Sequence, residues 1–424
     1  MQPIFKEFIK FLHDSGVDIP IKEGYYWFEN NLIKAFTPDG VLHKLYRIKT
    51  DDNLNITYKK HKDFVEAGET KFETWLETAE RMKHDIHSLV DESLAIIESV
   101  RNQYKDFDMY CLTSTGKDSV VTLDLVRKKI PWIKIMFNNT SLDVADTYKI
   151  VKSHSDWIVT NPKEGFYNYI SRLNYIPSRV SRGCCTLFKE HQSTRYFEQN
   201  NIKKVVHFMG VRNQESLKRA DRQFIEHNPK WSNPDWISCL PIRKWSDLDI
   251  WSYIFMNNLE INHKYKKGYG RVGCGIACPY QYPFLWALDR YWYPNLYNKW
   301  HNILEDNFIK NESWTRLNCT KEEYHKCWSG SLYRPEPTEE VVTEFMNFKG
   351  IQDKHVAMKY FNKVCCECGK SVRHSDVVAM NLKFLGRDSD IIYCKKCLCK
   401  KINIQSDKWD EYIRDFKYQG CDLF

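Results

Sequence analysis

The chain has 424 residues, of which 42% are hydrophobic, and a formal net charge of +8 at pH 7. Its size predicts two or three domains, and no stretch approaches the roughly 18 consecutive apolar residues of a membrane span. The start MQPIFKEFIKFLHDSG lacks the pattern of a secretory signal, so we expect a cytoplasmic protein with no membrane partner. The positive charge either favours anionic partners such as nucleotides and nucleic acid or reflects only a solvated surface.

The first part of the chain combines a sheet signal with a helix signal. Aromatic and β-branched residues occupy residues 24–58 on both sides of Pro38-Asp39-Gly40, a turn sequence in which proline fixes φ and glycine adds freedom. From Phe72 to Val100 apolar residues recur at steps of three and four, which predicts one long amphipathic helix packed on the main domain. We therefore expect residues 1–104 to form a small β-sheet and a long helix.

Four short apolar runs follow, at residues 109–114, 132–139, 156–160 and 205–210, with helical stretches between them. Such runs are typical of buried parallel strands. Strands that alternate with helices predict an α/β fold with a doubly wound, mainly parallel sheet, which binds its ligand beyond the carboxyl ends of the strands. We expect this domain at residues 105–300, a helical connection at 301–345 and a cysteine-rich module at 346–424.

A tight turn links the first of these strands to its helix, in the segment MYCLTS-TGKDS-VVTLDLVRKK. Backbone N–H groups at a helix amino end carry partial positive charge and can hold a phosphate. Gly116 lets the backbone approach such a ligand closely, and Lys117 adds a point charge. The spacing is not that of a Walker A loop. The turn predicts a phosphate-binding loop, with an ordinary capped helix start as the alternative, made of Ser114, Thr115, Gly116, Lys117, Asp118 and Ser119.

This loop resembles the S-G-G-K-D-S loop of the ATP pyrophosphatases, with Thr115 in place of a glycine. Five further segments resemble, in order and approximate spacing, the motifs of the phosphoadenosine phosphosulfate (PAPS) reductase family of adenine nucleotide α-hydrolases. They are FNNTSLDVADTYKIV (137–151), RGCCTLFKEH (182–191), GVRNQESLKRADR (210–222), CLPIRKWSDLDIWSYI (239–254) and NHKYKKGYGRVGCGIACPY (262–280). The resemblance spans about residues 105–300.

The resemblance implies an adenine nucleotide site. Lys117 and Asp118 are its expected catalytic residues, with Asp118 near a Mg²⁺ ion, and the whole loop together with Asn139, Arg212 and Arg219 is expected to bind the nucleotide. Guanidinium groups suit an anionic ligand, and a salt-bridged helix face is the alternative for residues 218–222. Side chains that could extend this lining are Arg182, Lys189 and Arg271. We expect Trp245, Trp251 and the aromatic residues from 284 to 300 to be core residues.

Four cysteines lie where iron–sulfur members of the family carry a CC…C-x2-C set, namely Cys184, Cys185, Cys274 and Cys278. Four thiolates suit a [4Fe-4S] cluster. The Cys274 to Cys278 spacing is one residue longer than in that set, so buried free thiols are the alternative. Cys319 and Cys327 could replace a ligand.

A second cysteine group forms two C-x2-C pairs, Cys365 with Cys368 and Cys394 with Cys397, separated by 25 residues. This spacing predicts a closed structural Zn²⁺ site of four thiolates in a zinc ribbon, which can stabilise a small domain outright. Cys366 and Cys399 are alternative ligands.

The resemblance leaves three functions open. In the first, the protein binds ATP with Mg²⁺, adenylates an acceptor and releases pyrophosphate, in sulfur transfer to or modification of nucleic acid; family members for DNA phosphorothioation and tRNA thiolation are the nearest analogues. In the second, it reduces PAPS or adenylylsulfate to sulfite. In the third, it is a nucleotide-binding subunit of a modification or defence complex. The G-K-D-S loop and the lack of the reductases' carboxy-terminal Glu-Cys-Gly-x-His motif favour the first.

Overall fold

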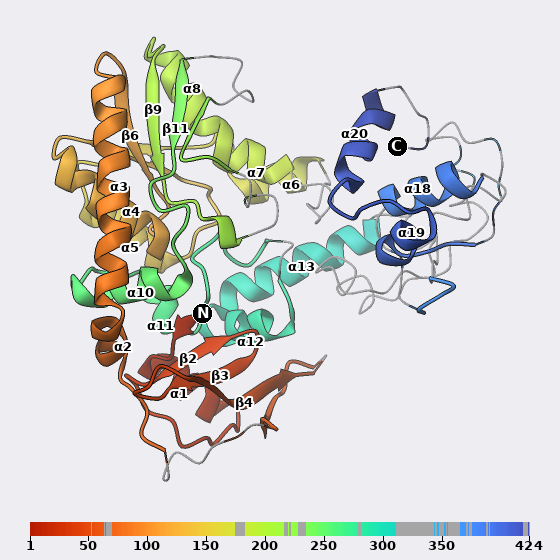
Figure 1. Cartoon of the computed structure of the whole chain (residues 1–424), viewed down its shortest axis with the longest axis horizontal. Coiled ribbons are helices and arrows are strands. Elements are labelled where there is room, and N and C mark those ends of the chain that lie inside the picture. The colour runs from red at the N-terminus through yellow and green to blue at the C-terminus, as the bar shows by residue number, and fades with distance from the viewer. Residues whose placement is uncertain are drawn as a thin grey trace. The chain divides into compact units, whose positions relative to one another are not determined.

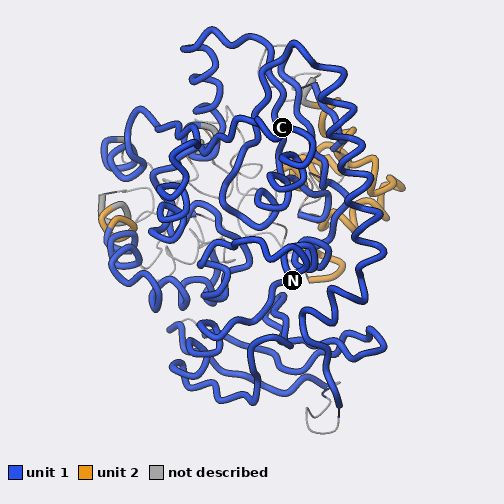
Figure 2. Tube along the Cα trace, turned by 90° about the vertical axis from the view of Figure 1, so that its left-hand side faces the viewer, with its two compact units in different colours: residues 1–302 blue, residues 303–424 orange. Residues whose placement is uncertain are grey.

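The computed structural model divides into two compact units, residues 1–302 and 303–424 (Figure 2). Helix α13 (Pro294–Lys310) spans the boundary between them. The structure describes residues 1–51, 53–62, 64, 70–173, 183–215, 219, 222–227, 235–278, 281–310, 343, 346, 352, 354, 365–369, 372, 375–386, 389, 391–418 and 423. Arg182, Cys319 and Cys327 lie outside these residues. No described helix is both long and apolar enough to cross a membrane.

The chain begins with an antiparallel five-stranded sheet in the order β1-β2-β3-β4-β5 (Figure 1). Its strands and the first helix are β1 (Gln2–Pro3), α1 (Lys6–Asp14), β2 (Tyr26–Glu29), β3 (Leu32–Phe36), β4 (Leu42–Thr50) and β5 (Ile56–Lys60). The predicted turn at Pro38-Asp39-Gly40 joins β3 to β4, and the Gly40 N–H donates to the Thr37 carbonyl at 2.8 Å. The predicted small sheet is confirmed.

The single long helix predicted over Phe72–Val100 is wrong in one respect, because two helices meet at Met82. These are α2 (Trp75–Arg81) and α3 (Lys83–Gln103). Hydrogen bonds continue across the break, since Met82 N donates to Thr78 O and Ile86 N donates to Met82 O. The two helices pack on different partners, α2 on α10 (Asp247–Met256) and α3 on α4 (Lys117–Lys129). Apolar spacing alone does not reveal this change of partner.

The second sheet has six strands in the order β10-β11-β9-β6-β7-β8, all parallel except β10. Its elements before α10 are β6 (Asp108–Thr113), α4, β7 (Lys134–Asn138), α5 (Ala145–Ser153), β8 (Ile158–Thr160), α6 (Phe166–Leu173), α7 (Gly183–Cys185), η1 (Thr186–Glu190), α8 (His191–Gln199), β9 (Val205–Met209), η2 (Asn213–Glu215), β10 (Ile225–His227) and β11 (Trp236–Cys239). Helices α11 (His263–Lys266) and α12 (Pro283–Trp292) follow α10. The four predicted strands are confirmed. Strand order reverses between β6 and β9, as in a doubly wound sheet.

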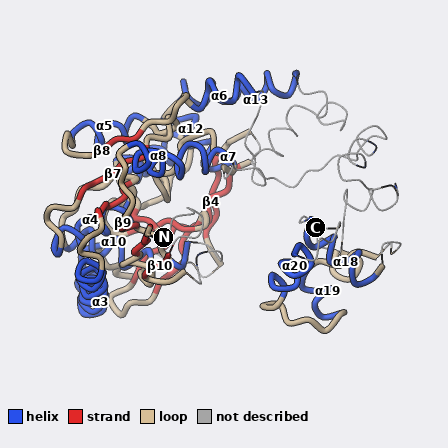
Figure 3. The backbone as a smooth tube through the Cα atoms, turned by 90° about the horizontal axis from the view of Figure 1, so that it is seen from above, coloured by secondary structure: helices blue, strands red, loops and turns tan. Residues whose placement is uncertain are grey.

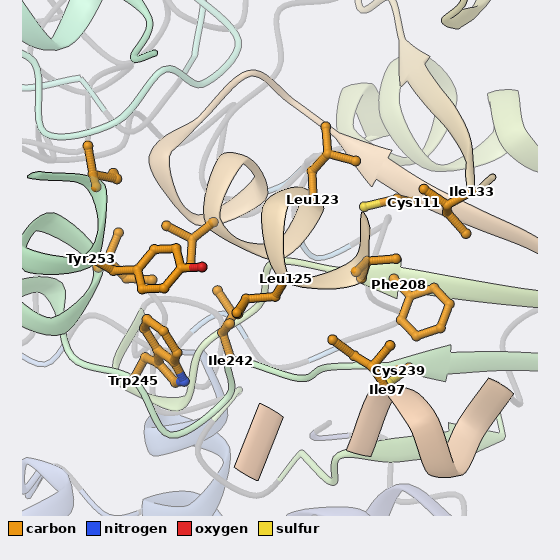
Figure 4. Packing of buried hydrophobic residues seen from close by; sticks show 14 of the residues in the cluster. Ile97, Cys111, Leu123, Leu125, Ile133, Phe208, Cys239, Ile242, Trp245 and Tyr253 are labelled. Carbon is orange, nitrogen blue, oxygen red and sulfur yellow. The ribbon is translucent and has the colours of Figure 1, made fainter. Parts of the chain in front are cut away.

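Apolar side chains cover both faces of this sheet. On one face, Cys111, Phe208 and Cys239 pack with residues of α3 and α4 (Figure 4). On the other face, Tyr110, Val205 and Trp236 pack around Phe197 of α8, and Figure 3 shows α3 and α8 on opposite sides of β9. The predicted core aromatics are buried in part: Trp245, Trp251, Phe284, Trp286 and Trp300 are buried, whereas Tyr291, Trp292, Tyr293 and Tyr297 are only partly buried.

The unit at residues 303–424 has a core of its own. Its helices α18 (Ser375–Leu385), α19 (Lys395–Lys401) and α20 (Trp409–Tyr418) bury Met380, Leu398 and Trp409 next to Cys365 and Cys397. Between residues 365 and 418, the described residues form helices and no strand. The predicted ribbon therefore remains unconfirmed, while the cysteine pairs do come together.

Candidate functional site

The loop Ser114–Ser119 lies at the carboxyl end of β6, where the strand order reverses. At such a switch point, doubly wound folds bind their ligands outside the carboxyl ends of the strands. Helix α4 begins within this loop at Lys117, with Gly116 as its N-cap and no side-chain hydrogen bond capping it. The first N–H groups of the helix therefore need acceptors from outside it.

Thr115 adopts a left-handed backbone conformation, with a φ of 57°, and its side chain is buried. This conformation is unfavourable for a β-branched residue. The Asn262 Nδ2 atom donates to Thr115 Oγ1 at 2.8 Å and to Thr147 Oγ1 at 3.1 Å. A buried amide therefore holds the threonine where the resembling loop has a glycine.

Other hydrogen bonds fix the rest of the loop. Ser119 Oγ donates to the Gly116 carbonyl at 2.8 Å and accepts from Ser114 N at 3.2 Å. The Lys117 N–H donates to the Tyr265 hydroxyl at 2.8 Å. Within the described residues, the N–H groups of Gly116, Asp118 and Ser119 have no hydrogen-bond partner. The Ser114 side chain is exposed, so a hydroxyl and three amides remain for a ligand.

Gly210, at the end of β9, packs directly on the beginning of α4. A Cβ atom at this position would lie 2.6 Å from the Asp118 carbonyl oxygen and 2.8 Å from Ser119 N. Only glycine permits this approach, because real Cβ atoms essentially never come this close to another atom. Two residues further on, Arg212 points to the same helix start, so the predicted Gly-x-Arg segment both packs against and contacts the loop.

An ion-pair network lies behind the loop. Lys117 Nζ is 2.9 Å from Asp118 and 3.0 Å from Asp247, the first residue of α10. Arg212 Nε donates to Asp118, and its Nη2 donates to Asp247 at 2.6 Å. The amino group of Met1 also contacts Asp247, at 2.5 Å. Lys117 and Arg212 are 4% and 3% exposed, so these two cations are paired rather than directed into solvent.

The network shifts the pKa of its members. Burial alone would raise the pKa of Asp247, but Lys117, the Met1 amino group and Arg212 hold that pKa well below its usual range. Burial also opposes the charge of Lys117, whose pKa is nevertheless raised by Asp118 and Asp247. The Lys117 ammonium and the Asp247 carboxylate are therefore charged near neutral pH.

The remaining predicted nucleotide ligands occupy two neighbouring segments. Asn139 Oδ1 accepts from Ser141 N and the Tyr148 hydroxyl, and its Nδ2 donates to Asn161. Asn139 therefore shapes the turn after β7. Arg219 is half-exposed and forms an ion pair with Glu215, whose carboxylate also accepts from the Arg212 N–H at 2.8 Å.

The residues of this site fall within a known protein domain. The phosphoadenosine phosphosulfate reductase domain matches residues 108–279, which include the loop, Arg212 and Asp247. The chain carries a PAPS reductase domain. The resemblance inferred from the loop and the five segments is thereby confirmed.

Relatives of this PAPS reductase domain include proteins of different lengths. An uncharacterised protein of Methanocaldococcus jannaschii is 28% identical over 61% of this chain and 62% of its own length. The chain thus spans less than two thirds of that relative. An adenosine 5'-phosphosulfate reductase of Bacillus mycoides is 23% identical over 48% of this chain and 86% of its own length. The crystal structure of a PAPS reductase from Candida auris, 18% identical, covers 46% of this chain and 94% of its own with a TM-score of 0.35.

Two cysteine pairs of the PAPS reductase domain lie near one another. A hydrogen bond with Cys185 and burial raise the pKa of Cys184, and the neighbouring Cys274 and Cys278 raise it further. Burial likewise raises the pKa of Cys274 to about 11, although Lys189 opposes this. Arg271 Nη2 donates to Cys278 Sγ at 3.4 Å. Cys184 thus lies near the other three predicted cluster ligands, but among the described residues the sulfur atoms that converge to within 4.8 Å belong to a different set of cysteines.

The second cysteine group can hold a metal ion. The sulfur atoms of Cys365, Cys368, Cys394 and Cys397 all lie within 4.8 Å of one another, and Cys368 Sγ is 3.7 Å from Cys394 Sγ. Two sulfurs on one tetrahedral Zn²⁺ would be about 3.8 Å apart, given a Zn–S distance of about 2.3 Å. The alternative ligand Cys366 is exposed, and Cys399 is buried.

Sequence reasoning missed three residues of the loop's surroundings, namely Asp247, Asn262 and Tyr265. Asn262 and Tyr265 lie in the segment 262–280. Each of them contacts the loop through a hydrogen bond to a residue almost 150 positions earlier in the chain, and the sequence alone does not show this bond. A signal existed for Asp247. Ser246 and Asp249 form a capping box, a pattern that marks a helix start and places Asp247 on its first turn.

Proposed function

We propose that the chain binds ATP at the loop Ser114–Ser119 and transfers the adenylyl group to an acceptor, with release of pyrophosphate. The observation that carries this proposal is the set of amide groups of Gly116, Asp118 and Ser119, which lack partners among the described residues at the amino end of α4. Phosphate oxygens are the natural acceptors for such groups. The exposed Ser114 hydroxyl adds a further donor.

The ion-pair network supports a role for Lys117 in this reaction. Both oxygens of Asp118 accept from Lys117, at 3.2 and 2.9 Å. A bound triphosphate would compete with the carboxylates for the Lys117 ammonium, and Asp247 would remain paired with Arg212. Arg212 Nε would still hold Asp118 Oδ1, so Asp118 Oδ2 would be the oxygen available to a Mg²⁺ ion, whose chemistry here is to neutralise phosphate charge.

In the proposed step, an acceptor oxygen attacks the α-phosphorus of ATP. A bond forms between that oxygen and phosphorus, the bond from the α-phosphorus to the bridging oxygen breaks, and pyrophosphate leaves with its electron pair. The acceptor proton passes to solvent. Lys117 and the loop amides stabilise the charge that develops on the phosphate oxygens.

The cysteines Cys184, Cys185, Cys274 and Cys278 would hold a [4Fe-4S] cluster, which ties this reaction to sulfur chemistry. The position of all four cysteines within the matched domain supports this assignment. When bound, such a cluster supplies electron transfer or a site for sulfur. Iron and sulfide analysis of anaerobically purified protein tests this assignment, and Cys274→Ser is the variant that should lose the iron.

We further propose that Cys365, Cys368, Cys394 and Cys397 hold a structural Zn²⁺. All four sulfurs converge within the range that one tetrahedral ion requires. The site would stabilise the unit at residues 303–424 and would take no part in the reaction.

Sulfonucleotide reduction is the second candidate function. The match to an adenosine 5'-phosphosulfate reductase over 86% of that protein's length favours it. In that case the same loop would bind PAPS or adenylylsulfate, and the product would be sulfite. The G-K-D-S sequence at residues 116–119 favours ATP, because the reductases of this family usually lack an intact loop.

Radiolabelled ATP distinguishes these functions. The protein is incubated with Mg²⁺, total cellular RNA or DNA, and ATP labelled at either the α or the γ phosphate. We expect the γ label to appear in pyrophosphate and the α label in the acceptor or in AMP, and we expect Lys117→Ala to abolish both. Lys129→Ala, at the other end of α4, is the matched control and should retain activity.

Two outcomes would overturn the adenylation proposal. One is release of the γ label as inorganic phosphate, because this would show that the γ-phosphorus and not the α-phosphorus is attacked. The other is the formation of sulfite from adenylylsulfate in the presence of a thiol reductant, without any pyrophosphate from ATP.

A further inference from the structure

Strands β4 and β5 and their connection carry a concentration of positive charge. Residues 42–60 contain five lysine or arginine residues and two acidic residues. The side chains of Lys44, Lys49 and Lys59 are exposed and that of Arg47 is half-buried. We call these four residues the basic ribbon. None of them has a carboxylate within 4 Å among the described residues.

Two like charges of the basic ribbon face each other directly. Arg47 of β4 is the cross-strand partner of Lys59 on β5, and Lys49 lies opposite Thr57. Directly opposite residues share a face of the sheet, and residues two apart on one strand share it as well. Arg47, Lys49 and Lys59 therefore lie on one face. Like charges in direct opposition destabilise a sheet, so folding gives no reason for this arrangement.

Protection of a sheet edge does not explain the arrangement either. Lysines on an edge strand prevent pairing with other chains, and β5 is the edge strand of this sheet. Edge protection thus accounts for Lys59. Arg47, however, lies where β4 is paired on both sides, with Leu32 of β3 and with Lys59 of β5.

The nearest described carboxylate in sequence is already occupied. Asp51, in the β4–β5 connection, accepts hydrogen bonds from Asn53 N at 2.9 Å and from Asn55 N at 2.8 Å. Its role is to close the turn. Asp51 therefore does not pair with the ribbon, which leaves the four side chains accessible to an anionic ligand.

We propose that the basic ribbon binds the sugar-phosphate backbone of a nucleic acid. Arg47 and Lys49, two residues apart on one strand, are separated by about 6.8 Å along it, and this repeated spacing suits a polymer of evenly spaced phosphates. A membrane surface would need apolar side chains as well. The large exposed apolar side chain on β5, Tyr58, donates its hydroxyl to the Asp18 carbonyl at 3.0 Å and packs edge-on against Tyr46.

The ribbon is fixed relative to the nucleotide site. Gln2 Nε2 of β1 donates to the Gly268 carbonyl at 2.7 Å, and Trp251 Nε1 of α10 donates to the Met1 carbonyl at 3.1 Å. The sheet that carries the ribbon thus packs on α10, whose first residue is Asp247 of the loop network. This inference rests on the proposed function in one respect, namely that the bound nucleic acid is the acceptor that becomes adenylated.

Fluorescence anisotropy tests the ribbon without ATP. The probes are labelled 20-nucleotide single-stranded DNA, single-stranded RNA and a DNA duplex, each titrated at several salt concentrations. The variant is the double substitution Arg47→Ala/Lys59→Ala. We expect it to lose affinity about tenfold at low salt and to reduce the slope of log K against log salt by roughly 1.4 to 1.8, because two phosphate contacts are lost. Relief of like-charge repulsion should leave its thermal stability equal or higher.

A control with the same loss of charge makes the result specific. Lys105→Ala/Lys152→Ala removes two exposed lysines elsewhere on the same unit and should change affinity less than twofold. Equal losses in the two double variants would overturn the proposal, as would wild-type binding by the ribbon variant or binding of phosphatidylserine vesicles in preference to all three probes. Lys117→Ala should still bind the probes. Loss of adenylation and loss of nucleic-acid binding by the ribbon are therefore measured separately.

Discussion

Asn262 donates a hydrogen bond of 2.8 Å to the hydroxyl of Thr115, and so holds a threonine in a conformation that favours glycine. The φ of Thr115 is 57°, and both side chains are buried. The same amide group reaches Thr147 on α5 at 3.1 Å. One residue therefore links the phosphate loop to the helix that follows the next strand.

This link predicts an order of stability for substitutions at Thr115. Thr115→Ala keeps the strained backbone and loses the hydrogen bond, which should cost about 1 to 2 kcal/mol. Thr115→Gly loses the same bond but relieves the strain, so its free energy of unfolding should lie within about 1 kcal/mol of the wild type. Urea unfolding of the three proteins measures this order. An alanine variant as stable as the wild type would show that Asn262 does not hold the loop.

Gly210 leads to a prediction about the geometry of the loop. Its substitution by alanine would place a Cβ atom 2.6 Å from the Asp118 carbonyl, so the start of α4 must move. We expect Gly210→Ala to lose about 1 to 3 kcal/mol of stability and to weaken ATP binding at least tenfold, as measured by calorimetry. Gly165→Ala is the control, since an added Cβ there meets nothing within 4 Å. Unchanged ATP affinity in Gly210→Ala would place the nucleotide elsewhere.

Much of the fold could be predicted because its signals are local. Strands β6, β7, β8 and β9 are apolar runs, and the loop after β6 is a glycine-containing turn before a helix. The partners of that loop could not be predicted in the same way. Asp247 and Asn262 reach it across a large separation in sequence, and such contacts depend on how α10 and α11 pack rather than on any local pattern. Likewise, apolar spacing predicted α2 and α3 as one helix, because spacing carries no information about which neighbours each half contacts.

Asp289 predicts an unusual dependence of stability on pH. It is 1% exposed and accepts from the Tyr269 hydroxyl at 2.7 Å and from Gln281 at 2.9 Å. Burial raises its pKa to about 6. Because the folded carboxyl binds its proton more tightly than the unfolded one, its contribution to stability is full below about pH 4 and is lost as pH rises to about 6.

The isosteric variant Asp289→Asn isolates this contribution. Relative to the wild type, its free energy of unfolding should rise by up to about 3 kcal/mol between pH 4 and pH 7, since a shift of one pKa unit corresponds to about 1.4 kcal/mol. Denaturant unfolding at pH 4, 5, 6 and 7 measures the difference, in which the other titrating groups cancel. A difference that does not vary with pH would mean that Asp289 titrates normally in the folded protein.

The last prediction concerns the cysteines Cys365, Cys368, Cys394 and Cys397. If they hold a structural Zn²⁺, metal analysis should find about one zinc per chain, and Cys368→Ser should lose it. Metal binding is coupled to folding in small domains, so that variant should become sensitive to protease within residues 303–424 while residues 1–302 remain resistant. Cys366→Ser is the matched control, because Cys366 is exposed and lies outside the group of four; it should keep both the zinc and the protease resistance. Full protease resistance in metal-free Cys368→Ser protein would show that packing around Leu398 and Trp409 stabilises this unit without a metal.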